Sequence, residues 1–98
     1  MKPIEFDYDA KAELADASYF YEDRRKGLGV SFLREAEKTV RRLAQFPESG
    51  RTEKPNIRRA FVKKFPYAIL YSIQPEKIFI VAVMHCSRKP GYWRERLK

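Results

Sequence analysis

The chain has few of the residues on which many metal and redox sites depend. Among its 98 residues are one cysteine, Cys86, and one histidine, His85. A single cysteine cannot close an internal disulfide, and these two residues cannot supply the ligands of a structural zinc site. We therefore expect a cytoplasmic protein that uses neither a metal nor another cofactor.

Long apolar stretches are missing as well. The longest runs from Ile78 to Met84, which is much too short to cross a bilayer. The first five residues are followed by acids and contain no apolar core of a secretory signal. With 44% apolar residues, the sequence predicts a folded chain with no membrane partner and one domain over residues 1–98.

Acidic residues are scarce in one half of the chain. Residues 1–49 hold 9 Lys or Arg and 10 Asp or Glu, whereas residues 50–98 hold 12 and 3. The formal net charge of +8 therefore comes from the second half. Such an asymmetry favours an anionic partner, either a nucleic acid or an acidic protein. A charged surface that keeps the protein in solution is the alternative.

Hydrophobic spacing predicts two helices in the first half. Residues 4–8 alternate as a half-buried strand does, and Asp9 follows as a helix N-cap. Apolar residues then recur at helical spacing in two stretches that are separated by Gly27-Leu28-Gly29. In the second stretch, residues 30–46, this apolar stripe is Val30, Leu33, Ala36, Val40 and Leu43.

The second half predicts strands. Residues 48–56 are expected to form a loop, and residues 78–84 a central strand covered on both faces. The complete order is β-α-α-β-β-β-α, with strands at 57–62, 67–73 and 78–84 and a short helix in the tail. This order predicts an α+β fold, a small curved and largely antiparallel sheet with a helical hairpin packed on one face.

Two groups of polar side chains could carry chemistry. After the last strand, His85 could act as a general base, Arg88 as a phosphate clamp and Tyr92 as a proton donor. The alternative is a structural role, with His85 hydrogen-bonded in the core. The second group, around the strand at 57–62, is either an anion-binding rim or an edge strand that its cations protect from aggregation; it consists of Arg58, Arg59, Lys63 and Lys64.

Three stretches of the second half resemble a known superfamily. They read Arg58-Arg59-x-Phe61-Val62, then Phe65-Pro66-Tyr67-x-Ile69-x-Tyr71, then Val83-x-His85-x-x-Arg88-x-Pro90-x-Tyr92-Trp93-x-x-Arg96. In this order they resemble the RelE/ParE toxins of bacteria, and the third is typical of the ParE-like, plasmid stabilisation branch. The resemblance covers nearly the whole chain. It implies a RelE/ParE-like fold and the toxin of a type II toxin–antitoxin pair, neutralised by an antitoxin that wraps around it.

The superfamily divides by activity. RelE-like members cleave mRNA in the ribosome with backbone-binding cations and a C-terminal tyrosine, whereas ParE-like members poison DNA gyrase. Arg59 and Tyr92 match the RelE-like set, but Phe61, Ala68 and Cys86 stand at or near positions where it has cations. Each lost cation would cost about 2–4 kcal/mol of transition-state stabilisation. The resemblance therefore favours a gyrase inhibitor without catalytic activity.

Two alternatives remain open at this point. The first is a ribosome-dependent mRNA endoribonuclease that uses His85, Arg88 and Tyr92, with Arg59 on a phosphate. The second is a nucleic-acid-binding module without toxicity.

The surfaces for these partners follow from charge and shape. An acidic antitoxin is expected to lay the apolar face of an amphipathic segment on the helical hairpin, at Tyr19, Phe20, Leu28 and Phe32, with its acids reaching the cations at 58, 59, 63 and 64. In the tail, Trp93 is expected to be a buried anchor. The target-binding surface is expected to consist of Arg58, Arg59, Lys63, Lys64, Arg88, Arg94 and Arg96.

Overall fold

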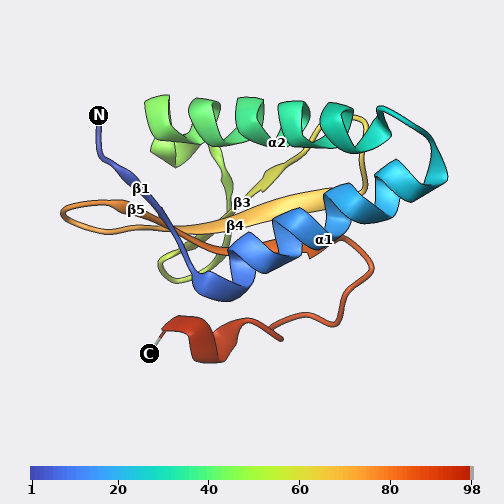
Figure 1. Cartoon of the computed structure of the whole chain (residues 1–98). Helices are drawn as coiled ribbons and strands as arrows, with labels where there is room; N and C mark the ends of the chain where they lie inside the picture. Colours follow the sequence, from blue (N-terminus) through green and yellow to red (C-terminus); the bar gives the residue numbers. More distant parts are fainter. Residues whose placement is uncertain (98) are drawn as a thin grey trace.

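The structure, a computed structural model that describes residues 1–97, combines two long helices with five strands (Figure 1). In chain order the elements are β1 (Ile4–Phe6), α1 (Tyr8–Arg24), α2 (Leu28–Gln45), η1 (Pro47–Ser49), β2 (Arg51–Lys54), β3 (Ile57–Phe61), β4 (Tyr67–Ile73), β5 (Ile78–His85) and η2 (Arg94–Leu97). The predicted α+β class is confirmed, with η2 in place of the expected tail helix.

The five strands form one mixed sheet. Their order is β1-β5-β4-β3-β2. Strand β1 pairs with β5 in parallel, whereas every other pair is antiparallel. The expected largely antiparallel sheet is thus confirmed. Strand β5 is an interior strand, but the middle position belongs to β4, because β1 adds one strand and the unpredicted β2 adds another.

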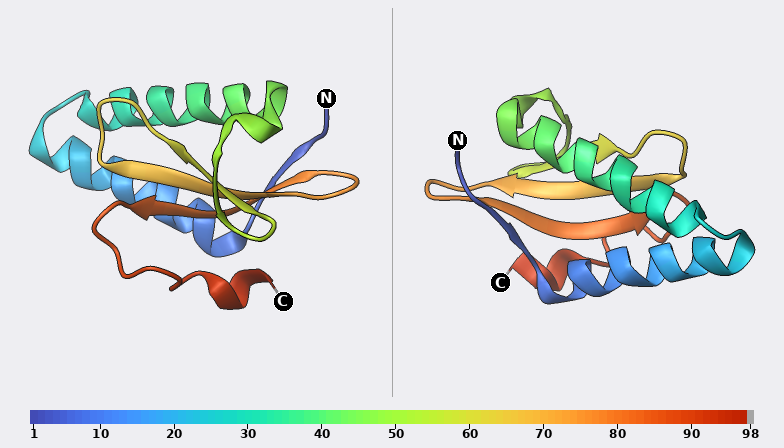
Figure 2. Two further views of the ribbon diagram at one scale, coloured as in Figure 1. Left: turned by 180° about the vertical axis from the view of Figure 1, so that it is seen from behind. Right: turned by 45° about the horizontal axis from the view of Figure 1, so that its top comes forward.

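The sheet is covered on both faces. Both helices lie on one face, and the C-terminal segment after β5 crosses the other (Figure 2). Between helices and sheet, Phe32 and Tyr71 belong to the larger apolar core, while Trp93 packs into a smaller core on the opposite face. Because β4 and β5 are covered on both sides, their side chains are almost all buried.

The helical hairpin depends on two local features of the sequence. Asp7 caps α1, since its carboxylate accepts hydrogen bonds from the backbone N–H groups of Asp9 and Ala10. The expected cap at Asp9 was therefore two residues late. Gly29 lets the helices approach closely, because a Cβ at this position would lie 2.5 Å from the backbone oxygen of Ser18 in α1.

The segment predicted as a loop contains strand β2. Its residues, Arg51 to Lys54, are polar and mostly exposed, so the strand carries no apolar alternation in the sequence. Tyr71 in β4 fixes the approach to this strand. Its hydroxyl donates a hydrogen bond to the Pro47 carbonyl (2.6 Å) and accepts one from the Gly50 N–H (3.1 Å).

The apolar stripe of α2 is only partly buried. Ala36 and Leu43 face the core as predicted, but Val30 and Leu33 are 50% and 41% exposed. The two helices diverge from their connecting turn (Figure 1), so this side of α2 faces open space rather than α1. In residues 1–97 no helix is apolar and long enough to pass through a membrane.

Candidate functional site

Glu13 on α1 holds the C-terminal segment against the sheet. Its two carboxylate oxygens accept hydrogen bonds from the Val83 backbone N–H (3.0 Å), the Tyr92 hydroxyl (2.7 Å) and two nitrogens of Arg96 (2.9 and 3.1 Å). Glu13 and Arg96 are both largely buried, with side chains 17% and 15% exposed. A helix, a strand and the tail therefore meet at one charged pair.

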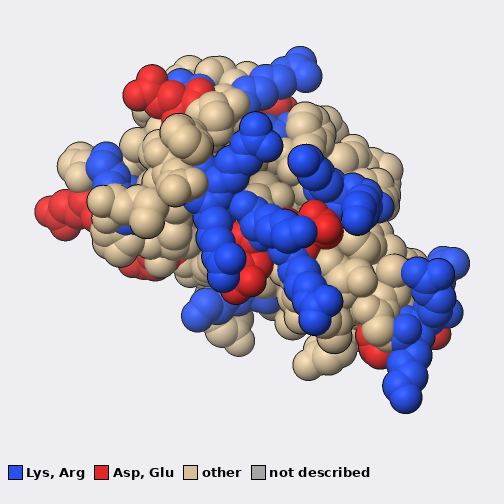
Figure 3. Space-filling model, turned by 90° about the horizontal axis from the view of Figure 1, so that it is seen from above, with Lys and Arg blue, Asp and Glu red and all other residues tan. Residues whose placement is uncertain are grey.

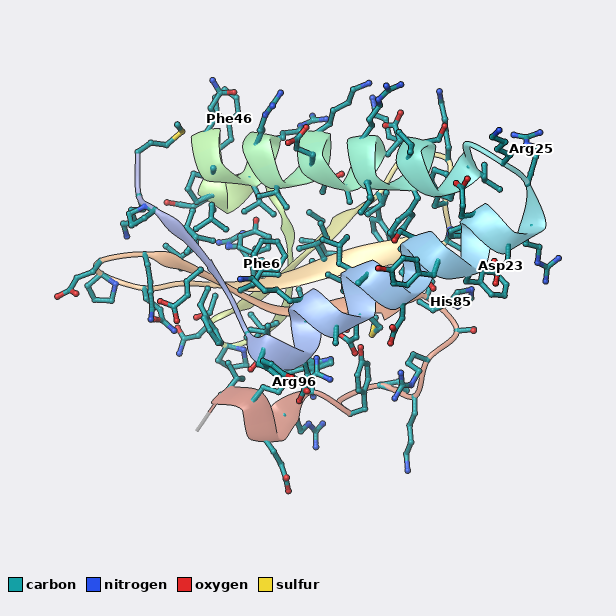
Figure 4. All side chains as sticks on the ribbon, in the orientation of Figure 1. Phe6, Asp23, Arg25, Phe46, His85 and Arg96 are labelled. Carbon is teal, nitrogen blue, oxygen red and sulfur yellow. The ribbon has the colours of Figure 1, made fainter. Side chains whose placement is uncertain are left out.

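Arg96 also interacts with other groups of the protein. It donates a hydrogen bond to the Val81 carbonyl (3.1 Å), and its Nε lies 3.8 Å from a carboxylate oxygen of Asp7. Figure 4 places the side chain between the tail and the start of α1. The expectation that Arg96 belongs to an exposed target-binding surface is therefore corrected, because its guanidinium group is already occupied within the fold.

Tyr92 has a structural hydrogen bond where a nuclease would need a proton donor. Burial raises the pKa of Tyr92 well above its ordinary value, and the hydrogen bond and negative charge of Glu13 raise it further. A phenol that donates to a buried carboxylate cannot offer the same proton to a substrate. The guanidinium groups of Arg88 and Arg96 lie against its ring, 4.1 and 5.1 Å from the ring centroid.

His85 ends β5 and packs edge-on against Tyr67, with ring centroids 5.1 Å apart. Its Nδ1 accepts a hydrogen bond from the Ser87 backbone N–H (3.1 Å), and the Ser87 hydroxyl lies 2.7 Å from the same nitrogen. This arrangement leaves the proton of the neutral ring on Nε2. Of the three residues expected to form a nuclease site, Arg88 and Tyr92 are in contact. The ring of His85 interacts with Ser87 rather than with either of them.

The turn after β5 is the exposed part of this region. Cys86 in this turn is exposed. Arg88 and Arg94 are exposed on either side of Gly91, so these two remain candidates for a target-binding surface. Trp93, 3% exposed, anchors the segment as the sequence predicted.

The two arginines of β3 are engaged within the protein. Arg58 donates hydrogen bonds to the carbonyls of Glu48 (3.0 Å) and Gly50 (2.8 Å), which secures the path into β2. Arg59 pairs with Glu53 of β2 at 2.9 Å and is 18% exposed. The sequence predicted both as free surface cations, because strand β2 beside them was not predicted. That expectation is corrected, since both guanidinium groups have partners within the protein.

An apolar groove opens where the helices diverge. It has a volume of about 500 Å³, and its walls come from both helices, β1 and the sheet beneath. Arg34 and Glu37 of α2 also line it. The apolar side chains that line it are Ile4, Phe6, Leu14, Val30, Leu33, Ala36, Val40, Ile69 and Val83.

The residues expected to bind an antitoxin do not form this groove. Tyr19 and Phe20 are exposed on α1 but do not line it, and Leu28 is half-buried. Phe32 is fully buried and packs against Phe65, with ring centroids 5.2 Å apart, so its assignment to the surface is corrected. The signal that could have found the groove is the apolar stripe of α2 itself, because Val30, Leu33 and Val40 of that stripe line the groove.

Comparison with known proteins identifies the family. The model of the ParE toxins of type II toxin–antitoxin systems, parDE, matches residues 4–90. The chain belongs to the ParE toxin family. A solved structure, described as the chromosomal ParDE toxin–antitoxin system from P. aeruginosa, superimposes with a TM-score of 0.77 and 18% identity, over 87% of this chain and 96% of that one. This likeness supports the fold of a ParE toxin. A search of curated proteins finds no match.

Proposed function

We propose that this ParE toxin inhibits DNA gyrase by binding it, without catalysis, and that an acidic antitoxin neutralises the toxin. The observation that carries the proposal is the hydrogen bond between Tyr92 and Glu13. The residue that a RelE-like nuclease would use for proton transfer has a structural role in this chain. A second observation supports it, since Phe61 and Ala68 occupy positions at which the nuclease branch has cations.

A gyrase assay tests the target. Purified toxin is added to gyrase, ATP and relaxed plasmid, and DNA is recovered after protein digestion. We expect linear, cleaved DNA to accumulate as toxin is added. The same result is expected for His85→Ala and Tyr92→Phe, because neither side chain takes part in a reaction. No change in gyrase activity at micromolar toxin, together with codon-linked cuts in translated mRNA that His85→Ala abolishes, would establish the nuclease alternative.

The apolar groove between the helices is the proposed antitoxin site. Val30 and Leu33 are apolar, exposed and adjacent on its wall. An amphipathic antitoxin segment would cover them with its apolar face and would fold on binding. Lys63 and Lys64 lie on the other side of α2 from this groove. They line two hollows beside Glu35 and Lys38, whereas the groove is lined by Leu33, Glu37 and Val40. The acids of a segment in the groove would therefore not reach Lys63 and Lys64 directly.

A matched pair of variants tests this site. The toxin is produced with the protein of the adjacent reading frame, and complex formation is followed by co-purification and calorimetry. We expect Leu33→Asp to weaken binding at least tenfold, because it places a charge in the groove. Tyr19→Asp adds the same charge at an exposed aromatic residue outside the groove and serves as the control. Equal binding of both variants would place the antitoxin elsewhere.

A further inference from the structure

The flank of α2 that faces away from the apolar groove is strongly basic. A hollow of about 340 Å³ lies between this flank and the edge formed by β2 and β3. Its lining contains five cations and a single carboxylate, that of Glu35. The cations are Lys38, Arg42, Arg51, Arg59 and Lys63.

A second hollow, of about 530 Å³, continues the first along the helix. The two share Lys38 and Glu35. Arg25, Arg34 and Lys64 add three more cations, and no further carboxylate lines this hollow. We call the two together the basic flank. Viewed from above α2, Lys and Arg side chains gather across the middle of this face around a few carboxylates (Figure 3).

Several of these cations are free to bind an external anion. The carboxylate of Glu35 lies 3.7 Å from Lys38 Nζ and 3.9 Å from Lys64 Nζ, distances too long for strong charge-assisted hydrogen bonds. Both lysine side chains are at least 70% exposed. Arg59 is not one of the free cations, because it is paired with Glu53 at 2.9 Å. Apart from Arg59, seven cations line the two hollows, and Glu35 is the one carboxylate in their lining.

The spacing of the cations suits a linear polyanion. Arg34, Lys38 and Arg42 recur every four residues and so follow one side of the helix over about 12 Å. This length corresponds to about three or four nucleotides of a stacked strand, whose rise along the helix axis is about 3.4 Å per nucleotide. Beside this row, the ring of Phe61 is 53% exposed and lies 5.8 Å from the Arg59 guanidinium carbon. Cations beside an exposed aromatic ring are the features that bind unpaired bases and their backbone.

An acidic peptide fits the basic flank less well. Peptide segments gain most of their affinity from buried apolar anchors. The apolar surface of this hairpin lies on the other flank of α2, in the groove that Leu33 and Val40 line. We propose that the basic flank binds the phosphate backbone of a single-stranded nucleic acid, with Phe61 stacking on one base. This activity goes beyond gyrase inhibition and stands whether or not gyrase is the target.

Fluorescence anisotropy with a labelled 20-nucleotide single strand tests the proposal. Lys38→Gln, Arg42→Gln and Lys63→Gln are combined in one protein. Lys11→Gln, Arg41→Gln and Lys89→Gln are combined in a control of equal net charge, whose three positions line neither hollow. Thermal unfolding confirms that both proteins fold.

We expect the first triple variant to bind about tenfold or more weakly than the control, and its plot of log K against log salt to be shallower by about two. Equal weakening by both triples would show that only net charge matters and would overturn the proposal. So would the absence of binding by the wild type at 50 mM salt. A 20-residue glutamate-rich peptide that outcompetes the oligonucleotide for the wild type, but not for the first triple, would make the flank a protein-binding site and overturn the nucleic-acid assignment.

Phe61→Ala tests the stacking step separately. We expect it to weaken single-strand binding about fivefold or more, and to leave binding of the corresponding duplex unchanged. An equal effect on both, or no effect on either, would remove Phe61 from the proposed site. A wild type that binds duplex more tightly than single strand at the same salt would overturn the single-strand assignment.

Discussion

The carboxylate of Glu13 on α1 accepts a hydrogen bond from the hydroxyl of Tyr92, 79 residues later in the chain, at 2.7 Å. The same carboxylate binds Arg96 and the backbone of β5. The polar groups of the tail are thus satisfied by one acidic residue of the first helix. The tyrosine and the arginine of this segment therefore both hold the tail against the first helix.

Glu13→Ala should be strongly destabilising. The change removes the closest carboxylate partner of Arg96 in a largely buried ion pair and leaves Tyr92 and the Val83 N–H without their acceptor, which should cost about 3–5 kcal/mol. Urea unfolding followed by circular dichroism measures this loss. The control is Glu37→Ala, because its pair with Arg41 is exposed on α2 and should contribute less than about 0.5 kcal/mol. Similar losses in both variants would contradict a central role for Glu13.

Stability should fall at alkaline pH. The pKa of Tyr92 is raised in the folded protein above its ordinary value of about 10. Folding therefore favours the protonated phenol, so this contribution is complete below about pH 10 and declines as pH rises further. The melting temperature should be level up to about pH 9.5 and then decrease. In Tyr92→Phe the decrease should be shallower, and an unchanged slope would mean that Tyr92 does not contribute to it.

Gly29→Ala should destabilise the hairpin although alanine is a better helix former. The added Cβ would meet the Ser18 backbone oxygen at 2.5 Å, and a backbone atom cannot move away without shifting the helix. We expect a loss of about 1–3 kcal/mol in thermal unfolding. Ser31→Ala, at an exposed position of the same helix, should leave the melting temperature nearly unchanged. A more stable Gly29→Ala protein would contradict the close approach.

Trp93→Ala should loosen the tail from the sheet. The indole is buried in the smaller core with Leu70 and Met84, and its removal should cost about 3–5 kcal/mol. Urea unfolding measures the loss, and proteolysis after Arg94 or Arg96 should become faster. Leu97→Ala, at a position 43% exposed, is the control and should have little effect on either measurement.

Arg88→Glu combined with Arg94→Glu should weaken toxicity without unfolding the protein. Both side chains are exposed beside the turn that follows β5, so their reversal changes the charge of the proposed target surface and, beyond that, removes the contact of Arg88 with the Tyr92 ring. Growth after induced expression and gyrase cleavage in vitro measure the effect. Lys11→Glu with Arg24→Glu makes the same charge change on α1. Full toxicity of the first pair would move the target surface away from this turn.

Much of the fold was predictable because apolar spacing marks elements that bury one face. Helices α1 and α2 and strands β3 to β5 appear in the sequence with small errors at their ends. Strand β2 does not, because a polar edge strand leaves no such spacing. That omission also made Arg58 and Arg59 look free, since their partners, Gly50 and Glu53, lie in the segment taken for a loop.

The basic flank was hidden by averaging charge along the sequence. Helix α1 carries five acids and two cations, whereas α2 carries four cations and two acids. In a count over residues 1–49 the net charges of the two helices nearly cancel. Folding then places Lys38 and Arg42 of α2 beside Lys63 from the second half. A surface assembled from distant segments cannot be found from regional charge alone.

The parallel pairing of β1 with β5 has a consequence for the order of folding. Ile4 to Phe6 bind strand residues Ile78 to Ile80, so this edge of the sheet cannot form until β5 has been synthesised. The docking of Arg96 on Glu13 comes later still. Contacts between such distant parts of a chain form slowly. The apolar groove proposed for the antitoxin has walls from β1 and β5, at Ile4, Phe6 and Val83. It is therefore complete only after β5 has left the ribosome and paired with β1.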